Sequence, residues 1–569
     1  MPFILLITRV GCLLACLILS FMPAAHPQVT ADGFHTIAHP QVNGNVYQPI
    51  ISANSLGGES WERAYRLVPD LSDPSVKYLA GAFQSSTLSF PVPSMAASLS
   101  AIDNAASNTT QNALLLKIRH EDNAVIWALP MGASSGGASR RNQALSVAVG
   151  LTGSAVFAVG DFSSTSFQLG AFLFSSTGPS DAWIAKLDAS DGTVLWARTF
   201  EGTGLEAAKS VVVDPLSGDV IVAGDFNSSS AAFNPDVNDI GARVLNNSED
   251  PKWGSGTGSE IWIAKLGAAD GQVHWMGHVS GLRSEVIGFN TTTGQWPVAF
   301  DSPGQSLAVD EDNNVYMTGS TNSTVLTYNP GMDPPSSNTF WDGGISRTKS
   351  DGMILKIRCN TGLLTWGMTF GMRATNDFGY AVAVAPNNGS SDVFVAGTVG
   401  GSPVYFGDPV RSVSGIRAVQ PFVARLSAQD GTPMWITSLG VAARTNRVLG
   451  LAVDTTRSLI HAAGFVASGN LPFGQSYGGL TNDSSTGDGF LWTLGTTEGH
   501  IEGGLVIAVD FTILDEAKEK ENAMAKLRKE ERNRRKAFII GFSILGIMII
   551  AGLSVFYRRQ RASPPVTPA

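Results

Sequence analysis

A basic residue followed ten positions later by tryptophan occurs five times along this chain of 569 residues. The segments around the five pairs are alike, whereas the number of residues between them varies. A fixed motif at variable intervals indicates one small structural unit that is repeated with loops of different lengths. The five pairs are Lys117/Trp127, Lys186/Trp196, Lys265/Trp275, Lys356/Trp366 and Arg425/Trp435.

A second motif alternates with the first, and together they predict the fold. It consists of two β-rich runs around a turn of Asp, Asn and Gly, as in residues 209–226 and 305–321. This pattern predicts a β-hairpin, and the Lys-to-Trp motif predicts another, which turns at sequences such as DASDG (188–192). Two hairpins give four antiparallel strands, A to D. Four-stranded units repeated around a ring are the blades of a β-propeller.

The number of blades follows from a glycine that recurs in strand B. Six such glycines predict an all-β propeller of six four-stranded blades within residues 57–511. In a seven-bladed alternative, residues 26–60 and 500–511 together form a degenerate blade. The six glycines are Gly81, Gly160, Gly224, Gly319, Gly397 and Gly464.

The repeats also resemble a known family. Residues 308–321 (AVDEDNNVYMTGST) and 181–200 (DAWIAKLDASDGTVLWARTF) resemble the seven-bladed β-propeller repeat family, SBBP. They resemble more loosely the repeats of pyrroloquinoline-quinone (PQQ) propellers, which share a DG-x-x-x-W ending. The resemblance covers about residues 60–500 and implies the fold. It implies no single activity, because propellers host many.

The repeated tryptophan and lysine are interpreted as structural. The tryptophan recurs whatever the loops contain, so we expect it to pack between adjacent blades. Strand alternation places Trp183 and Lys186 on opposite faces of their strand. A half-buried lysine requires a carboxylate, and the expected partner is the aspartate that ends several A strands. These aspartates are Asp214, Asp310 and Asp454.

Apolar segments at both ends predict a membrane protein. Residues 1–25 have the pattern of a secretory signal peptide, followed by an N-terminal segment, 26–56. Residues 537–557 carry no charge, and at about 1.5 Å per residue they span a bilayer. A charged helical stalk, 512–536, precedes this span and a cytoplasmic tail, 558–569, follows it. We expect a single-pass type I protein of the plasma membrane or endomembranes, with its propeller extracellular or lumenal.

The basic residues near the span oppose this orientation. Nine Lys and Arg lie in residues 514–536, before the span, and three follow it, whereas the positive-inside rule favours the reverse. We give the signal peptide more weight, because a cleaved signal commits the following domain to translocation. Seven N-x-S/T sequons before the span agree with a glycoprotein. They are at Asn108, Asn227, Asn246, Asn290, Asn322, Asn388 and Asn482.

Charge and cysteine content exclude some classes of function. Residues 26–510 contain 25 Lys and Arg against 41 Asp and Glu, a net charge of −16, which excludes nucleic-acid binding through bulk charge. Cys359 is the only cysteine beyond the predicted signal, and alanine occupies its place in other repeats. We therefore expect a small buried residue there rather than a reactive thiol.

Loop lengths predict where a ligand binds. The A–B and C–D turns are short, whereas the B–C loops are long, and long loops on a rigid scaffold usually carry binding. Some D–A loops, notably 280–304, are long too, and they share a face with the B–C loops. We predict a module that binds or adheres to a protein or glycan through this B–C/D–A loop face, with no cofactor and no catalytic or metal-binding residue. Alternatives are a quinoprotein-like or glycan-processing enzyme, which convergent charged side chains at the centre of the ring would favour, and a structural cell-surface protein. The long B–C loops are 163–180, 227–259, 321–350, 400–419 and 467–487.

Overall fold

The computed structural model divides into two compact units, Met1–Val509 and Asp510–Ala569, and the first contains every residue described below. The predicted signal peptide, N-terminal segment, stalk, membrane span and tail lie outside the described residues. Within the described residues, no helix has the length and apolar character needed to cross a membrane. The structure describes residues 62–90, 101–103, 111–133, 141–233, 244–247, 259–281, 285–286, 305–323, 325–329, 338–341, 350–372, 375–387, 390–400, 404–407, 412–413, 420–438, 447–455, 457–466, 470–472, 479–481, 488–497, 499 and 501–507.

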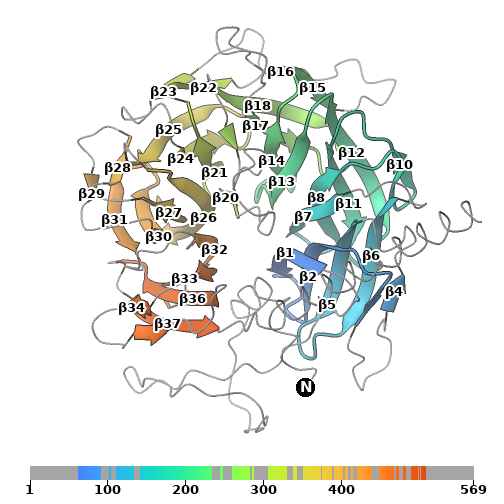
Figure 1. Ribbon diagram of the computed structural model, residues 1–569, viewed down its shortest axis with the longest axis horizontal. Coiled ribbons are helices and arrows are strands. Elements are labelled where there is room, and N and C mark those ends of the chain that lie inside the picture. Colours follow the sequence, from blue (N-terminus) through green and yellow to red (C-terminus); the bar gives the residue numbers. More distant parts are fainter. Residues whose placement is uncertain are drawn as a thin grey trace, which may run out of the picture. The chain divides into compact units, whose positions relative to one another are not determined.

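Six antiparallel sheets follow one another along the chain, and each is built on four strands in chain order, to which further strands are added in four of the sheets (Figure 1). Blades 1 and 2 consist of β1 (Glu62–Pro69), β2 (Val76–Phe83), β5 (Asn112–Arg119), β6 (Val125–Ala133), β7 (Asn142–Val149), β8 (Ala155–Phe162), β11 (Asp181–Asp188) and β12 (Val194–Gly202). Blades 3 and 4 consist of β13 (Glu206–Val213), β14 (Val220–Phe226), β17 (Glu260–Leu266), β18 (Val273–Gly281), β20 (Leu307–Val309), β21 (Asn314–Thr321), β24 (Asp351–Arg358) and β25 (Leu364–Gly371), with β19 (Glu285–Val286) beside β21. Blades 5 and 6 consist of β26 (Phe378–Asn387), β27 (Ser390–Val399), β30 (Gln420–Ser427), β31 (Pro433–Ser438), β32 (Arg447–Asp454), β33 (Leu459–Val466), β36 (Asp488–Gly495) and β37 (Ile501–Ile507).

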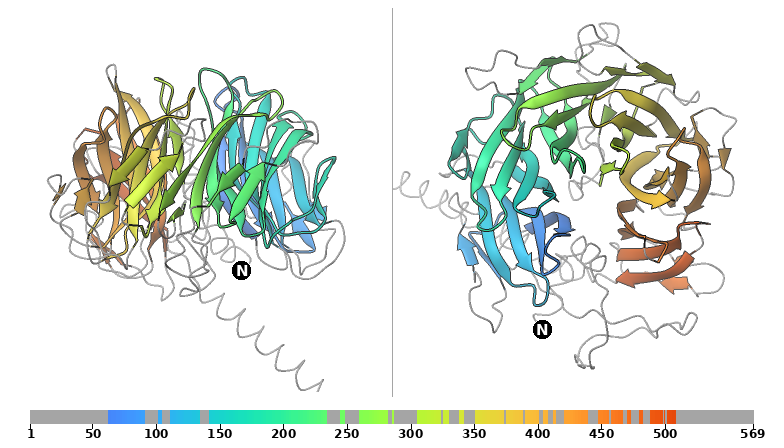
Figure 2. Two further views of the ribbon diagram at one scale, coloured as in Figure 1. Left: turned by 90° about the horizontal axis from the view of Figure 1, so that it is seen from above. Right: turned by 180° about the vertical axis from the view of Figure 1, so that it is seen from behind.

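The all-β, propeller-like architecture confirms the predicted fold class, and the described residues form six blades. Strand β37 corrects the seven-bladed alternative, because residues 501–507 supply the last strand of blade 6. Strand A of one blade contacts strand A of the next, as β7 does with β13 and β26 with β32. These contacts place the A strands on the inner side of the sheets, which share one general strand direction (Figure 2).

The hydrophobic core lies in layers between successive blades. Trp183 and Leu187 of blade 2 pack with Tyr78 and Leu115 of blade 1, all of them buried. On the opposite face of the same strand, Ile184 belongs to the layer between blades 2 and 3. This arrangement confirms the predicted alternation. Each buried side chain of this size contributes about 1.5–3 kcal/mol relative to an exposed one, so each blade is stabilised mainly by its neighbours.

The described parts of the long B–C connections contain paired strands, which the sequence did not predict. Each contains a two-stranded hairpin, and four of the hairpins extend the sheet of the preceding blade through the pairs β6–β9, β12–β15, β18–β22 and β25–β28. The hairpins are β3 (Thr87–Ser89) with β4 (Ala101–Asp103), β9 (Phe167–Leu169) with β10 (Phe172–Phe174), β15 (Ser230–Phe233) with β16 (Val244–Asn246), β22 (Val325–Asn329) with β23 (Asn338–Trp341), β28 (Val404–Phe406) with β29 (Ser412–Val413), and β34 (Asn470–Pro472) with β35 (Gly479–Thr481). An outermost strand exposes unpaired N–H and C=O groups, and these hairpins satisfy them. In the described part, four of the six B–C segments therefore cover sheet edges, whereas β3–β4 and β34–β35 form separate two-stranded sheets.

A β-bulge recurs near the start of strand A. In five blades the A–B register shifts by one residue at this place, which leaves one extra residue in strand A. In blade 4, the Ser306 carbonyl accepts a hydrogen bond from the Thr318 N–H at 3.0 Å, which puts Gln305 at the equivalent position. We call these six the bulge residues: Tyr65, Leu145, Lys209, Gln305, Tyr380 and Leu449.

The bulge explains the glycine that recurs in strand B. It brings a strand-A carbonyl directly over the glycine Cα, so that a Cβ on Gly160 would overlap the Gln143 oxygen and one on Gly224 the Ala207 oxygen. The Gln143 carbonyl also accepts a hydrogen bond from the Trp183 Nε1–H at 3.1 Å. Glycine is required there by close packing and not by a turn.

Candidate functional site

The five repeated tryptophans join each blade to the next. The indole Nε1–H of Trp196 donates to the Ala268 carbonyl at 3.1 Å, in the C–D turn of the following blade. Gly271 of that turn has φ +70°, and a Cβ there would lie 2.9 Å from the Trp196 ring. Equivalent bonds of 2.8–3.2 Å join Trp127 to Ala189, Trp275 to Cys359, Trp366 to Ala428 and Trp435 to Thr496. We call this contact the inter-blade latch.

Three of the repeated lysines belong to the same latch, which corrects the predicted ion pairs. The Nζ atoms of Lys117, Lys186 and Lys356 donate to the carbonyls of Ala189, Ala268 and Ala428 at 2.8, 2.8 and 2.9 Å. Each ammonium also lies 5.4–5.9 Å from the centre of an aromatic ring in strand B, which is within the range of a cation–π contact. These lysines therefore bind the next blade.

The residues at the end of strand A, where the aspartate partners were predicted, explain why these three lysines form no such ion pair. In blade 4, Asp310 already accepts hydrogen bonds from the Tyr316 hydroxyl at 2.8 Å and from Asn314. In blade 2, the chain has Gly150 where the aspartate was expected. In blade 1, Asp70 accepts hydrogen bonds from the N–H and the hydroxyl of Ser72 at 2.9 and 2.7 Å. Blade 6 has Thr493 in place of the repeated lysine, and its Asp454 pairs with Arg457 at 3.3 Å. The carboxylate is thus engaged or absent.

Blade 3 shows the expected pairing. Strand B has Ile221 in place of an aromatic residue, and the Lys265 ammonium lies 2.6 Å from the Asp214 carboxylate. Burial by itself raises the pKa of Asp214, but hydrogen bonds from Lys265 and from the following turn outweigh it and hold this pKa below its usual range. In blade 5, the guanidinium of Arg425 pairs with Asp392 at 2.8 Å. The repeated basic residue therefore pairs with a carboxylate of its own blade in blades 3 and 5, and it donates to a carbonyl of the next blade in blades 1, 2 and 4.

Cys359, the one cysteine beyond the predicted signal, is fully buried, as expected, and burial raises the pKa of its thiol.

Three of the seven predicted glycosylation sites lie within the described residues. Of the sequons, Asn246 is exposed at the end of β16, whereas Asn227 and Asn322 are half-buried and accept hydrogen bonds. The other four lie outside the described residues: Asn108, Asn290, Asn388 and Asn482. Within the described ranges, no three His, Cys, Asp or Glu residues gather as a metal site would require.

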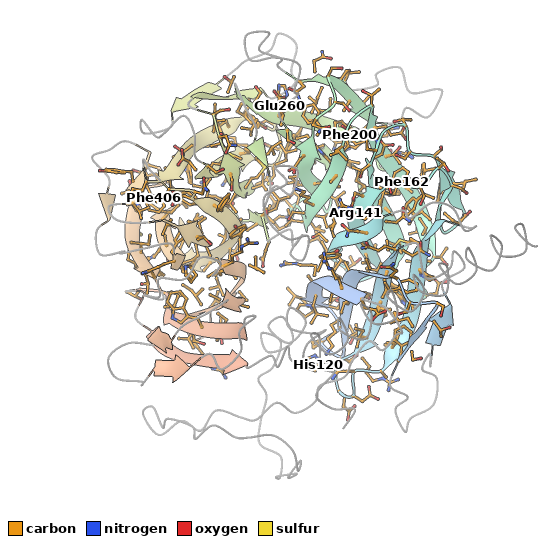
Figure 3. All side chains as sticks on the ribbon, in the orientation of Figure 1. His120, Arg141, Phe162, Phe200, Glu260 and Phe406 are labelled. Carbon is orange, nitrogen blue, oxygen red and sulfur yellow. The ribbon has the colours of Figure 1, made fainter. Side chains whose placement is uncertain are left out.

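A second polar region, which the sequence analysis missed, surrounds the bulge residues. We call it the central cluster and define it by five cations, two carboxylates and four uncharged polar residues. Figure 3 places one of its members, Arg141, on the inner side of the sheets, whereas Phe200 and Phe406 lie among the strands. The members are Arg63, Arg66, Arg141, Lys209 and Arg447, Asp161 and Asp225, and Tyr65, Gln143, Gln305 and Tyr380.

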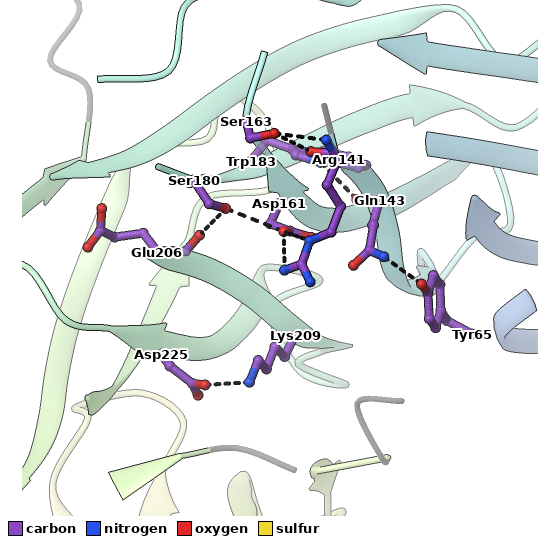
Figure 4. A network of polar contacts seen from close by, with 10 residues as sticks. All are labelled: Tyr65, Arg141, Gln143, Asp161, Ser163, Ser180, Trp183, Glu206, Lys209 and Asp225. Carbon is purple, nitrogen blue, oxygen red and sulfur yellow. Dashed lines mark hydrogen bonds and ion pairs between the residues drawn. The ribbon is translucent and has the colours of Figure 1, made fainter. Parts of the chain in front are cut away.

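Blades 1 to 3 provide the best-defined part of this cluster (Figure 4). The Arg141 guanidinium pairs with the buried Asp161 carboxylate at 2.8 Å. The Lys209 ammonium pairs in the same way with Asp225. The Gln143 side-chain amide donates to the Tyr65 hydroxyl at 2.6 Å, across the boundary between blades 2 and 1.

Gln305 of blade 4 connects this blade to blades 1 and 5 within the central cluster. Its side-chain oxygen accepts a hydrogen bond from the Arg66 guanidinium of blade 1 at 2.7 Å. Its own carbonyl accepts from the Val382 N–H of blade 5 at 2.8 Å. The Arg447 guanidinium of blade 6 lies 6.0 Å from the centre of the Tyr380 ring. Residues from all the blades but one, and far apart in sequence, are thereby linked near the centre.

The charge of the central cluster is opposite to that of the protein around it. Burial, partly offset by the nearby Arg63, raises the pKa of Tyr65 to about 12, so that its hydroxyl is neutral at physiological pH. The described members of the central cluster comprise five cations and two carboxylates, whereas residues 26–510 as a whole have a net charge of −16. Arg141 is exposed, and the other four cations are half-buried. The cluster can therefore attract an anionic group and still reach solvent.

Two carboxyl groups with raised pKa values have a different role. Burial raises the pKa of Glu206 to about 7 and that of Asp377 to about 6. Glu206 accepts from the Ser228 hydroxyl at 2.6 Å, and Asp377 accepts from the Gly400 N–H at 2.6 Å. Each thus fixes a residue within two positions of the end of strand B of its own blade. These hydrogen bonds give both carboxyl groups a structural role, and no catalytic role is needed to explain them.

The comparisons with known proteins agree with the repeat. Residues 303–327 match the family model "Beta-propeller repeat", SBBP. This match confirms the resemblance for one repeat. No curated protein matches the chain.

Solved structures with a related arrangement include quinohemoprotein alcohol dehydrogenases. One, from Comamonas testosteroni, is 11% identical over 70% of this chain and 59% of its own, with a TM-score of 0.27. Another, from Pseudomonas putida HK5, is 12% identical over 72% of this chain and 70% of its own, with a TM-score of 0.29. A DUF4221 family member from Bacteroides vulgatus is 11% identical over 62% of this chain and 78% of its own, with a TM-score of 0.24. The chain thus spans 59% of the first of these structures, and likeness at this level carries no argument about activity.

Proposed function

We propose that this protein is a binding module whose propeller recognises the acidic groups of a protein or glycan ligand. The observation that supports the proposal is the central cluster. It gathers cations from blades 1, 2, 3 and 6 in a region that is otherwise strongly acidic. Such a reversal of charge focuses the electrostatic field on a small area and favours an anionic ligand.

The side chains suit the recognition of carboxylate or sulfate groups. Guanidinium groups donate in a planar fork that matches two oxygens of such an anion. Arg63 and Arg66 come from the same strand and are half-buried, so their geometry is restricted before a ligand binds. Arg141 and Lys209 are tied to carboxylates, which orients them at the cost of part of their charge.

Binding of defined polymers to the purified full-length chain tests this proposal. Suitable probes are polygalacturonate, heparin and polyglutamate, with neutral dextran as a control, each measured at several salt concentrations. The double variant Arg63→Gln/Arg66→Gln removes two cations from the cluster. The matched control is Arg198→Gln/Arg457→Gln, which removes two arginines from other parts of the propeller.

The expected result is salt-sensitive binding of at least one acidic probe and none of dextran. The central double variant should weaken binding by about tenfold or more, a loss of about 1.4 kcal/mol, whereas the control should not. Equal losses in both variants would mean that general charge, and not the cluster, attracts the polymer. Preference for polyglutamate over both glycans would identify a protein ligand.

We also propose that the propeller is an extracytoplasmic glycoprotein held by the segment 537–557. The seven sequons and the signal-like residues 1–25 support this topology, and the exposed Asn246 is the described sequon best placed to carry a glycan. Protease treatment of intact cells that express a C-terminally tagged chain tests it, together with deglycosylation. A protected tag and a glycosylated ectodomain fragment are expected. A cleaved tag without glycan would mean the reverse orientation.

An enzyme is the second candidate, because convergent charged side chains at the centre were the feature expected to favour one. Within the described part of the cluster, both carboxylates are paired with cations, and neither is free to act as a general acid or base. A binding role therefore comes first. Depolymerisation of an acidic glycan that binds, abolished in Arg63→Gln/Arg66→Gln, would reverse this order.

A further inference from the structure

Three exposed leucines occupy matching turns at the other end of strand A. Leu71, Leu151 and Leu216 lie in the A–B turns of blades 1, 2 and 3, and their exposed fractions are 90%, 53% and 68%. The bulge residues lie near the start of strand A and these turns follow its end, so the leucines lie on the side of the propeller away from the central cluster. We call them the leucine arc.

The three turns form one continuous surface. A Cβ on Gly153 of the second turn would lie 3.2 Å from the Asp70 carboxylate of the first turn. A Cβ on Gly218 of the third turn would lie 3.6 Å from the Leu151 side chain. Neighbouring turns therefore touch, and the leucines belong to a single exposed strip.

The fold does not require leucine at these places. The turn of blade 4 has Glu311, and the turn of blade 6 has Thr455, yet both blades have the same four strands. Single exposed leucines are ordinary on protein surfaces, but three in adjacent turns form a patch. A patch that folding does not explain points to a binding partner.

The charges around the leucine arc indicate what kind of partner fits. The A–B and C–D turns of blades 1 to 3 cover residues 70–75, 120–124, 150–154, 189–193, 214–219 and 267–272, and they contain no Lys or Arg. They contain eight acidic residues: Asp70, Asp73, Glu121, Asp122, Asp191, Asp214, Asp219 and Asp270. Three of these are already paired, Asp122 with Arg119 and both Asp214 and Asp219 with Lys265. Four of these, Asp73, Glu121, Asp191 and Asp270, are exposed. Hydrogen bonds from Ser75 hold the pKa of Asp73 below its usual value, so this carboxylate stays charged at physiological pH.

We infer that the leucine arc is a docking surface for a basic amphipathic helix of a partner protein. The apolar face of such a helix would cover the three leucines, and its Lys and Arg side chains would meet the acidic turns around them. The same acidic surround disfavours an anionic membrane as the occupant. This surface is separate from the central cluster, so the inference stands without the proposed acidic ligand.

A designed peptide pair tests the inference. The probe is a helical peptide of leucine and lysine with leucine on one face, and its binding to the full-length chain is measured by fluorescence anisotropy. One control peptide replaces leucine by alanine and keeps the charge, and another replaces lysine by glutamate and keeps the leucines. The protein variant is Leu71→Ser/Leu151→Ser/Leu216→Ser. Its matched control, Leu173→Ser/Leu195→Ser/Met434→Ser, changes three exposed apolar residues elsewhere.

The leucine–lysine peptide should bind, and both control peptides should bind at least tenfold more weakly. The arc variant should lose about tenfold in affinity, with an unchanged melting temperature, and the control variant should bind like the native chain. Binding that survives in the arc variant would overturn the inference. Concentration-dependent self-association that the arc variant abolishes would also overturn it, because the occupant would then be a second copy of the chain.

Discussion

The inter-blade latch and the ring of bulge residues are both repeated, yet only the latch repeats its side chains. In five latches a tryptophan donates to a carbonyl of the next C–D turn. At the bulge, the six equivalent positions hold Tyr, Leu, Lys, Gln, Tyr and Leu. The latch acts through its side chain, which keeps that side chain constant. The bulge constrains only the backbone, which leaves its side chain free to serve recognition.

The first prediction concerns the glycine that the bulge requires. Gly160→Ala should cost more than about 4 kcal/mol or prevent folding, because the new Cβ overlaps the Gln143 carbonyl and neither backbone can move alone. Urea unfolding followed by tryptophan fluorescence measures the loss. Gly450→Ala is the control, since a Cβ there meets no atom within 4 Å and should change stability by less than about 1 kcal/mol. Equal effects would contradict the role given to the bulge.

The second prediction tests the latch. Trp196→Ala should cost about 3–5 kcal/mol, because it removes a buried ring from the contact between blades 2 and 3. Trp196→Phe keeps most of the ring and loses the hydrogen bond to Ala268, so its cost should be near 1 kcal/mol. Urea titration of both variants separates packing from hydrogen bonding. A loss below 1 kcal/mol for Trp196→Ala would mean that the latch does not hold the blades together.

The third prediction compares the contributions to stability of two lysines at the same position of the repeat. Lys265→Met should cost about 3–5 kcal/mol, because it leaves the Asp214 carboxylate buried without its ion pair. Lys186→Met loses a hydrogen bond to a carbonyl that Trp196 still satisfies, and should cost about 1 kcal/mol. Chemical denaturation at pH 7 compares the two variants. Similar costs would show that the acceptor of the lysine does not matter.

The fourth and smallest effect is a dependence on pH. The pKa of Glu206 is about 7 in the folded protein, above its ordinary value of 4.5, so the folded state keeps this proton longer than the unfolded state does. Its contribution is fully present below pH 4.5 and is lost as the pH rises toward 7, by about 1–3 kcal/mol. Glu206→Gln should flatten this part of the stability profile. An unchanged slope between pH 4.5 and 7 would show that Glu206 is ionised in the fold.

The sequence predicted the strands well and the partners of side chains poorly. The alternation of residues 181–188 placed Trp183 and Lys186 on opposite faces, because the period of a strand is a local property. The aspartate partner of Lys186 was wrong, because the acceptor belongs to a turn about 80 residues farther along the chain. In the candidate site, none of the bulge residues stood out, since their side chains share no pattern. The recurring strand-B glycine was the one signal that could have pointed to the bulge.

The sequence by itself determined the repeat, the four strands of each blade and the residues that face each interior, because hydrogen-bonding pattern and side-chain alternation act within short segments. Only the tertiary structure decided that four of the six B–C segments pair with the preceding blade and that Arg66 reaches Gln305. It alone gathered cations at the centre of an acidic protein and leucines on three adjacent turns. These features depend on distances between residues that are about 30 to 240 positions apart, which the register and bulges of six sheets fix and no local pattern records.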